Sequence, residues 1–180
     1  MSTNRIIGKY EYKESGKIDF KMKISFCADD FKKEWTRCNY TANYIAEYSA
    51  YNFDPGDKAE NLISTVINEL VERLALISEK KARLSVSLAL EDDILIVDVE
   101  NRISADKRDM YEKTVARINN ENIDKLYMDN ITANPVEEEN EFEFGLVMLV
   151  NDYRCRIGSL IVDGGTAVTR LIIDNEEVKK

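Results

Sequence analysis

Apolar residues recur along the chain with a helical spacing of three to four in some stretches and with a strand spacing of two in others. The clearest helical stretch runs from Lys58 to Ser78. Its single broad apolar stripe contains Leu62, Ile63, Val66, Ile67, Leu70, Leu74 and Ile77. A second helical pattern covers Phe31 to Tyr51, and Pro55 and Gly56 separate the two stretches. We therefore expect two long helices, each with one buried face.

The N-terminal part of the chain alternates between apolar and polar positions. Ile18, Phe20, Met22 and Ile24 are spaced by two. Residues 6–27 are therefore expected to form a β-hairpin, with a turn at 14–17 supplied by Glu-Ser-Gly-Lys.

Four further strands are predicted. Residues 83–90 alternate strictly, whereas residues 94–99 form a nearly continuous apolar run that is typical of a central strand. Residues 156–162 and 167–173 flank Asp163-Gly-Gly, which favours a closing hairpin.

The remaining segments predict shorter helices and one loop. Polar helices are expected from Ser104 to about Asn120 and over residues 122–128, and an acidic loop over residues 134–141 precedes a helix at 145–153. The tail at 174–180 is expected to fray. This order of elements predicts one α+β domain over residues 1–180, a two-layer sandwich whose mixed, mostly antiparallel sheet carries helices on one face.

Composition narrows the classes of function. The chain has 180 residues, 44% of them hydrophobic, and a net charge of −9. A negative domain lacks the positive surface that nucleic acids and anionic membranes require, so neither is expected as a partner. The sequence contains no apolar run of 18 residues and no apolar signal core near Met1, which makes the cytoplasm the expected location.

The chain has no histidine, which excludes a Ser-His-Asp triad, a Cys-His pair and histidine-ligated metals. Cys27, Cys38 and Cys155 are widely spaced and odd in number, so they are expected to be buried thiols rather than disulfide or zinc ligands. No metal site is predicted.

The segment at 68–73, Asn-Glu-Leu-Val-Glu-Arg, carries a family resemblance. It is similar to the first motif of the GHKL group of ATPases and protein kinases, in which a helical Glu is followed four residues later by an Asn that helps to hold the Mg²⁺ of the nucleotide. Glu69 matches the Glu, whereas Arg73 stands in place of the Asn.

Three more segments resemble one bacterial branch of that group, the SiaB-like signalling proteins, which are similar to anti-sigma-factor serine kinases. They are the Trp-centred stretch at 34–48, the strand end at 99–104 and the glycine-led stretch at 144–153. The resemblance implies ATP as cofactor and Glu69 as general base toward a hydroxyl substrate. It also places Asn101 where many members read adenine with an Asp, and Gly145 where phosphate approaches a helix start.

Two departures change what the resemblance predicts. Arg73 replaces a metal ligand, and Glu143 replaces one glycine of a Gly-x-Gly pair, where a carboxylate would repel phosphate. The preferred hypothesis is therefore a bacterial signalling domain with impaired nucleotide binding, similar to a pseudokinase. It would act in a partner-switching pathway on a small STAS-like or SiaC-like antagonist protein.

Other interpretations stay open. An active serine/threonine kinase would need Asn68 or Glu72 to replace the missing ligand of Mg-ATP, and Arg73 could instead meet the triphosphate directly. A third alternative is a ligand-free module that forms a homodimer through the first long helix.

Each candidate residue also has a purely structural interpretation. Glu69 and Arg73 can form an i,i+4 ion pair. Asn101 can be a turn residue, and Gly145 can allow close packing. Trp35 and the tyrosines that follow it fit a core better than an interface, and the acidic loop fits a solvated segment or a docking surface for a basic partner.

Overall fold

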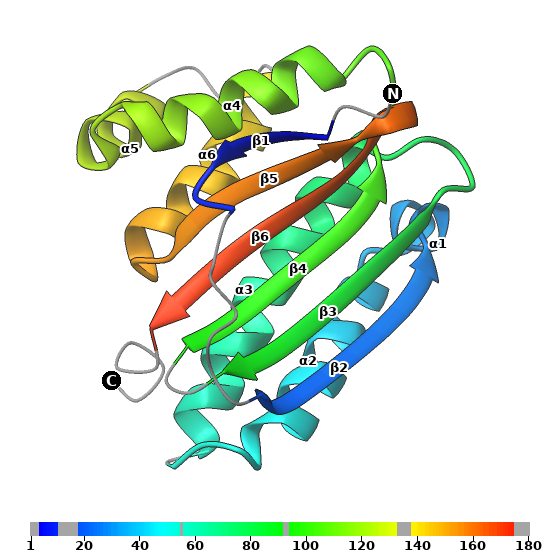
Figure 1. Cartoon of the computed structure of the whole chain (residues 1–180), viewed down its shortest axis with the longest axis vertical. Helices are drawn as coiled ribbons and strands as arrows, with labels where there is room; N and C mark the ends of the chain where they lie inside the picture. The colour runs from blue at the N-terminus through cyan, green and yellow to red at the C-terminus, as the bar shows by residue number, and fades with distance from the viewer. Residues whose placement is uncertain (1–3, 11–17, 55, 92–93, 133–137, 175–180) are drawn as a thin grey trace.

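The computed structural model describes residues 4–10, 18–54, 56–91, 94–132 and 138–174. Its strands form one open sheet in the order β1-β5-β6-β4-β3-β2, and every pairing between described strands is antiparallel (Figure 1). The sheet is therefore not mixed. The strands are β1 (Arg5–Gly8), β2 (Ile18–Cys27), β3 (Arg83–Glu91), β4 (Ile94–Arg102), β5 (Arg156–Val162) and β6 (Thr166–Asp174).

Helices cover one face of this sheet. In Figure 1, α2 and α3 pass behind the strands, and α4 and α5 lie at the end of the sheet formed by β1 and β5. The prediction of a two-layer α+β sandwich is confirmed. The helices are α1 (Ala28–Lys33), α2 (Thr36–Ala50), α3 (Gly56–Ile77), α4 (Arg108–Asn120), α5 (Ile123–Thr132) and α6 (Glu138–Asp152).

The core lies between α3 and the middle strands. The alternation in β3, β4 and β6 turns one set of apolar side chains toward the helices, and the stripe on α3 meets them. Burying this apolar surface is the main stabilising contribution to the fold. The fully buried residues at this contact include Ile63, Val66, Ile67, Leu70, Leu74, Leu84, Leu88, Leu95, Val97 and Leu171.

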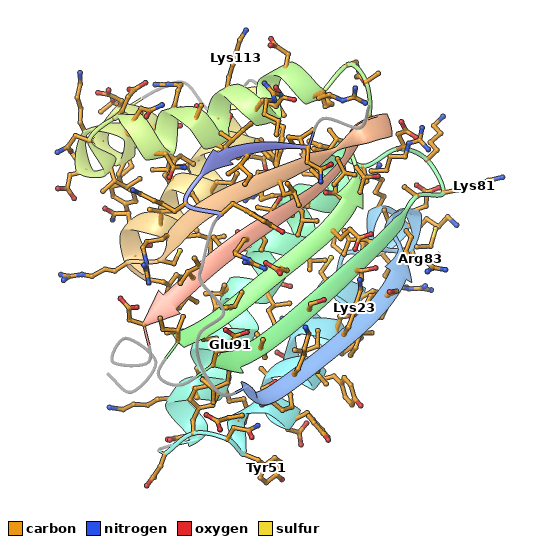
Figure 2. All side chains as sticks on the ribbon, in the orientation of Figure 1. Lys23, Tyr51, Lys81, Arg83, Glu91 and Lys113 are labelled. Carbon is orange, nitrogen blue, oxygen red and sulfur yellow. The ribbon has the colours of Figure 1, made fainter. Side chains whose placement is uncertain are left out.

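The opposite face of the sheet carries polar and charged side chains. Asp98 on β4 accepts two hydrogen bonds of 2.7 Å from the guanidinium of Arg170 on β6. Lys23 of β2, labelled in Figure 2, donates to Glu100 at 3.1 Å. The two faces explain why the strand pattern has a period of two.

The predicted N-terminal hairpin is wrong. β1 pairs with β5, and β2 pairs with β3, so the two strands lie at opposite edges of the sheet. The alternation at residues 18–27 specifies a strand and its buried face, but it does not specify a partner. The predicted turn at 14–17 lies outside the described residues.

Several helix boundaries differ from the predictions, and the helix expected over residues 122–128 continues to Thr132. The stretch 31–51 is broken, because Glu34 has an extended backbone between α1 and α2. The helix expected from Ser104 begins only at Arg108, after a turn. The helix expected from Gly145 begins at Glu138, so residues 138–141 of the predicted acidic loop are helical.

The other elements agree with the pattern. α3, β3 and β4 lie where they were predicted, and β5 and β6 form the closing hairpin across Asp163–Gly165. Gly164 and Gly165 have φ values of 81° and 86°, a conformation that favours glycine. Residues 134–137 of the loop and 175–180 of the tail lie outside the described part of the chain. Within that part, no helix combines the length and hydropathy needed to cross a membrane.

Candidate functional site on helices α3 and α6

The structure brings Glu69, Arg73 and Gly145 together where α3 meets α6. The guanidinium of Arg73 lies 3.5 Å from the Glu69 carboxylate and 3.0 Å from the carboxylate of Glu141. The side chain of Arg73 is only 16% exposed. The two carboxylates balance the charge of the arginine between the helices, but only Glu141 accepts a hydrogen bond from it. Glu69 Oε2 and Arg73 Nε are buried and have no hydrogen-bond partner among the described residues. We call Glu69, Arg73, Glu141 and Gly145 the Arg73 cluster.

Gly145 is the residue that lets α6 approach this arginine. A methyl group at Gly145 would lie 2.9 Å from Cδ of Arg73 and 3.1 Å from its Cγ, which is too close for an ordinary contact. Gly145 lies within α6, so the prediction that it starts a helix is wrong. The free N–H groups that bind phosphate occur only in the first turn of a helix, and in α6 that turn begins at Glu138.

Asn101 is not part of this cluster. Its amide group donates to the carbonyl oxygen of Leu74 at 3.2 Å and to the hydroxyl of Ser78 at 2.8 Å. Asn101 is 1% exposed and lies in β4 rather than in a turn, so the turn interpretation is wrong. Its oxygen has no hydrogen-bond partner among the described residues. The side chain ties β4 to the C-terminal end of α3.

Asn68 and Glu72 form a hydrogen bond with each other, and Glu72 lies close enough to Glu69 and Arg73 to feel their charges. The amide of Asn68 donates to the Glu72 carboxylate at 3.2 Å. Burial, and then the charge of Glu69, raises the pKa of Glu72. Burial and the nearby Glu72 raise the pKa of the Cys38 thiol on α2 to about 12. Asn68 and Glu72 thus lie on the part of α3 that is close to α2.

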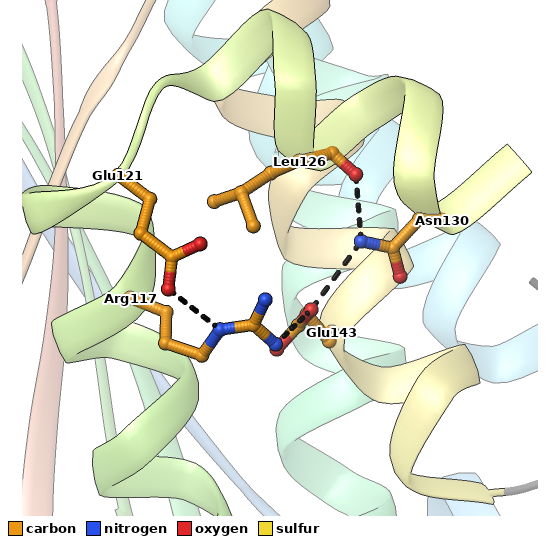
Figure 3. Close-up of polar contacts among 5 residues, drawn as sticks. All are labelled: Arg117, Glu121, Leu126, Asn130 and Glu143. Carbon is orange, nitrogen blue, oxygen red and sulfur yellow. Dashed lines mark hydrogen bonds and ion pairs between the residues drawn. The ribbon is translucent and has the colours of Figure 1, made fainter.

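Glu143 joins three helices at a separate place (Figure 3). Arg117 of α4 donates to both of its carboxylate oxygens at 2.8 Å, and Asn130 of α5 donates at 3.3 Å. The same arginine bonds Glu121 at 2.9 Å, and this hydrogen bond lowers the pKa of Glu121. The expectation that Glu143 faces a phosphate site at a helix start is therefore wrong. Its carboxylate accepts hydrogen bonds from side chains of α4 and α5, and α6 begins at Glu138.

Sequence reasoning missed two groups of residues. Tyr111 is fully buried and its hydroxyl bonds Ser159 at 2.6 Å and Thr169 at 2.7 Å, which anchors α4 to the sheet.

The expectation that Trp35 and the tyrosines of α2 lie in the core is also wrong. They are exposed, and the small buried residues Cys38, Ala42 and Ala46 face α3 instead. The size of these residues was the available signal, because small side chains allow close helix packing.

The cysteines form no disulfide. Cys38 and Cys155 are buried, and Cys27 is half-buried. Burial raises the pKa of Cys155 to about 12, so this thiol stays protonated at neutral pH. The described residues contain no group of three or more His, Cys, Asp or Glu side chains that could hold a metal ion.

Comparisons with known proteins identify no family. A scan against protein-family models found no match, and a search of curated proteins found no significantly similar sequence.

Proposed function

We propose that the chain is a bacterial cytoplasmic signalling domain, similar to the GHKL protein-serine kinases, which binds a protein partner and does not use Mg-ATP at the Arg73 cluster. The observation that carries this proposal is the position of Arg73. It is paired with Glu69 and Glu141 and packed against Gly145.

The chemistry of Mg²⁺ supports this proposal. Mg²⁺ takes oxygen ligands from carboxylates, phosphates and water in a strict octahedral geometry. A guanidinium offers only N–H donors and carries a positive charge, so Arg73 cannot take the place of a metal-binding Asn.

The same contacts disfavour binding of a triphosphate by Arg73 itself. The arginine would have to leave Glu69 and Glu141, and the two carboxylates would then repel the phosphates. The active-kinase alternative gains no support from Asn68 or Glu72, since these two side chains pair with each other. We therefore favour a partner-switching role in which a small STAS-like or SiaC-like protein is the partner.

Isothermal titration of the whole chain with ATP and ADP, each with and without Mg²⁺, tests the proposal. We expect no binding tighter than millimolar under any of these conditions. Micromolar binding that requires Mg²⁺ would overturn the proposal. It would then call for a kinase assay with Glu69→Gln as control.

The variant Arg73→Asn is a useful companion. It restores the residue that the GHKL motif has at this position and removes the cation beside Gly145. Weak, Mg²⁺-dependent binding gained only by this variant would show that Arg73 is what closes the site.

A further inference from the structure

The outer side of α2 carries a continuous row of exposed aromatic side chains. Tyr40, Tyr44, Tyr48 and Tyr51 are 72%, 58%, 55% and 88% exposed. Their spacing of four, four and three residues places them on one side of the helix. Figure 2 shows Tyr51 projecting away from the fold. We call these four residues the tyrosine face.

Within the tyrosine face, Tyr48 contacts the ring of Phe20 on β2, with the two ring centroids 6.0 Å apart. No ring contact is found for Tyr40, Tyr44 or Tyr51 among the described residues. The opposite side of α2 already buries Cys38, Ala42, Ile45 and Ala46. Most of the large hydrophobic side chains that are exposed in the described residues lie on α2 or next to it. Such a concentration marks an interaction surface, and tyrosine is among the residues most enriched at the energetic centres of interfaces.

A hollow beside Tyr51, at the end of the tyrosine face, favours a positively charged ligand. The hollow has a volume of about 410 Å³, and its lining includes Glu47, Tyr51, Phe53 and Glu60. Glu47 and Glu60 form no ion pair with any described residue. Two carboxylates beside two aromatic rings suit a cation, because the carboxylates attract its charge and the rings offer cation–π contact.

The sequence around the hollow is also negatively charged. Between residues 38 and 68 the chain has four acidic residues, Glu47, Asp54, Asp57 and Glu60, and Lys58 is the one basic residue. A second copy of the chain would bring an identical acidic surface, so a two-fold contact through this face would place like charges together. Charge complementarity therefore favours a basic partner over a homodimer.

We propose that the tyrosine face and its hollow bind a basic segment of a protein partner. A lysine or arginine side chain enters the hollow between Glu47 and Glu60 and lies against Tyr51, while apolar side chains of the same segment cover Tyr44. This inference rests on the proposed function only for the existence of a protein partner.

An NMR titration tests this surface. The ¹⁵N-labelled whole chain, at physiological salt, is titrated with a synthetic peptide that alternates leucine with lysine and arginine, and with a matched peptide in which glutamate replaces the basic residues. We expect saturable shifts at residues 40–60 with the basic peptide only. The variant E47Q/E60Q should weaken binding roughly fivefold, as expected for the loss of two exposed ion pairs.

Two controls separate this site from general attraction to a negative protein. Asp124→Asn/Asp129→Asn removes the same charge from the exposed side of α5 and should leave the affinity unchanged. Tyr44→Ser/Tyr51→Ser should weaken binding, although both side chains are exposed and the fold should persist. Equal weakening by the two charge variants, or shifts spread over the molecule, would overturn the proposal.

Concentration-dependent shifts of residues 40–51 without peptide, together with a dimer mass from light scattering, would also overturn it in favour of self-association. The nucleotide titration is independent of these results. Mg-ATP binding with intact peptide binding would refute the proposed function alone, and absence of both would refute only the assignment of this surface.

Discussion

The Arg73 cluster and the tyrosine face differ in how far their polar and aromatic groups are buried and paired within the fold. In the cluster, the guanidinium is paired twice, largely buried and packed against Gly145. On the tyrosine face, four aromatic rings are exposed and the nearby Glu47 and Glu60 have no ionic partner among the described residues. The charges of the cluster are balanced within the fold, although Glu69 Oε2 and Arg73 Nε have no hydrogen-bond partner among the described residues. The exposed groups of the tyrosine face are available to another molecule.

This difference predicts that residues near α3 control stability and that residues of the tyrosine face do not. Asn101→Ala should show the largest effect, because it removes the two side-chain hydrogen bonds from Asn101 to Leu74 and Ser78 and leaves a small cavity. We expect a loss of about 2–3 kcal/mol in the free energy of unfolding, measured by urea denaturation. Tyr44→Ala should change it by less than about 0.5 kcal/mol. Similar losses for both variants would contradict the comparison.

The next largest loss of stability is expected when the ion pair between Arg117 and Glu143 is broken. Arg117→Gln removes the guanidinium that bonds both oxygens of the mostly buried Glu143 carboxylate. The expected loss is about 1–2 kcal/mol, because a poorly solvated carboxylate is left without its ionic partner. The control Lys113→Gln breaks a well-exposed pair with Asp109 on the same helix and should cost less than about 0.5 kcal/mol. An equally small loss for Arg117→Gln would mean that the ion pair between Arg117 and Glu143 does not stabilise the fold.

Because Arg73 packs on Gly145, we predict that Gly145→Ala lowers stability when Arg73 is present and raises it when Arg73 is absent. Gly145→Ala should destabilise the protein by about 1 kcal/mol, because overpacking outweighs the helix propensity that alanine gains. In the Arg73→Ala background the obstructing side chain is gone, so the same change should stabilise the protein by up to about 1 kcal/mol. Thermal or urea denaturation of the four proteins measures this coupling. Equal effects in both backgrounds would show that Arg73 does not fill this space.

The smallest expected effect depends on pH. Burial and Glu69 raise the pKa of Glu72 above its ordinary value of 4.5, so the folded state holds this proton more tightly than the unfolded state does. Ionisation of Glu72 therefore lowers stability as the pH rises from 4.5 through the folded-state pKa. Glu72→Gln should be more stable than the wild type at pH 7, by less than about 0.5 kcal/mol after allowing for solvent screening.

Urea denaturation at both ends of this range measures the Glu72 effect. The advantage of Glu72→Gln should disappear below pH 4.5, where Glu72 is protonated in both states. A constant difference across the range would assign the effect to something other than this titration.

The parts of the fold that follow from local pattern could be predicted. The period of two in β3 and β6 and the stripe on α3 each reflect burial of one face, which a single segment records in its own sequence. Strand pairing depends on distant residues, and so the partner of β2 could not be inferred from residues 18–27.

The candidate site was only partly accessible to sequence reasoning. The pairing of Glu69 with Arg73 follows from helix geometry, because residues four apart lie on the same side. The roles of Glu141 and Glu143 depend on where α6 begins, and the sequence placed that start at Gly145. Asn101 shows the same limit, since its partners Leu74 and Ser78 are distant in sequence.

We propose that Arg73 closes the place where the resemblance to the GHKL kinases would put Mg-ATP. The most direct test is a ¹H–¹⁵N NMR titration of the wild type with Mg-ATP, in which the amides of Gly145, Glu69 and Asn101 are followed to millimolar nucleotide. The account predicts that these three signals do not move, and that any weak shifts lie elsewhere on the protein. Saturable shifts of Gly145 and Glu69 at micromolar Mg-ATP, abolished when Mg²⁺ is removed, would contradict it.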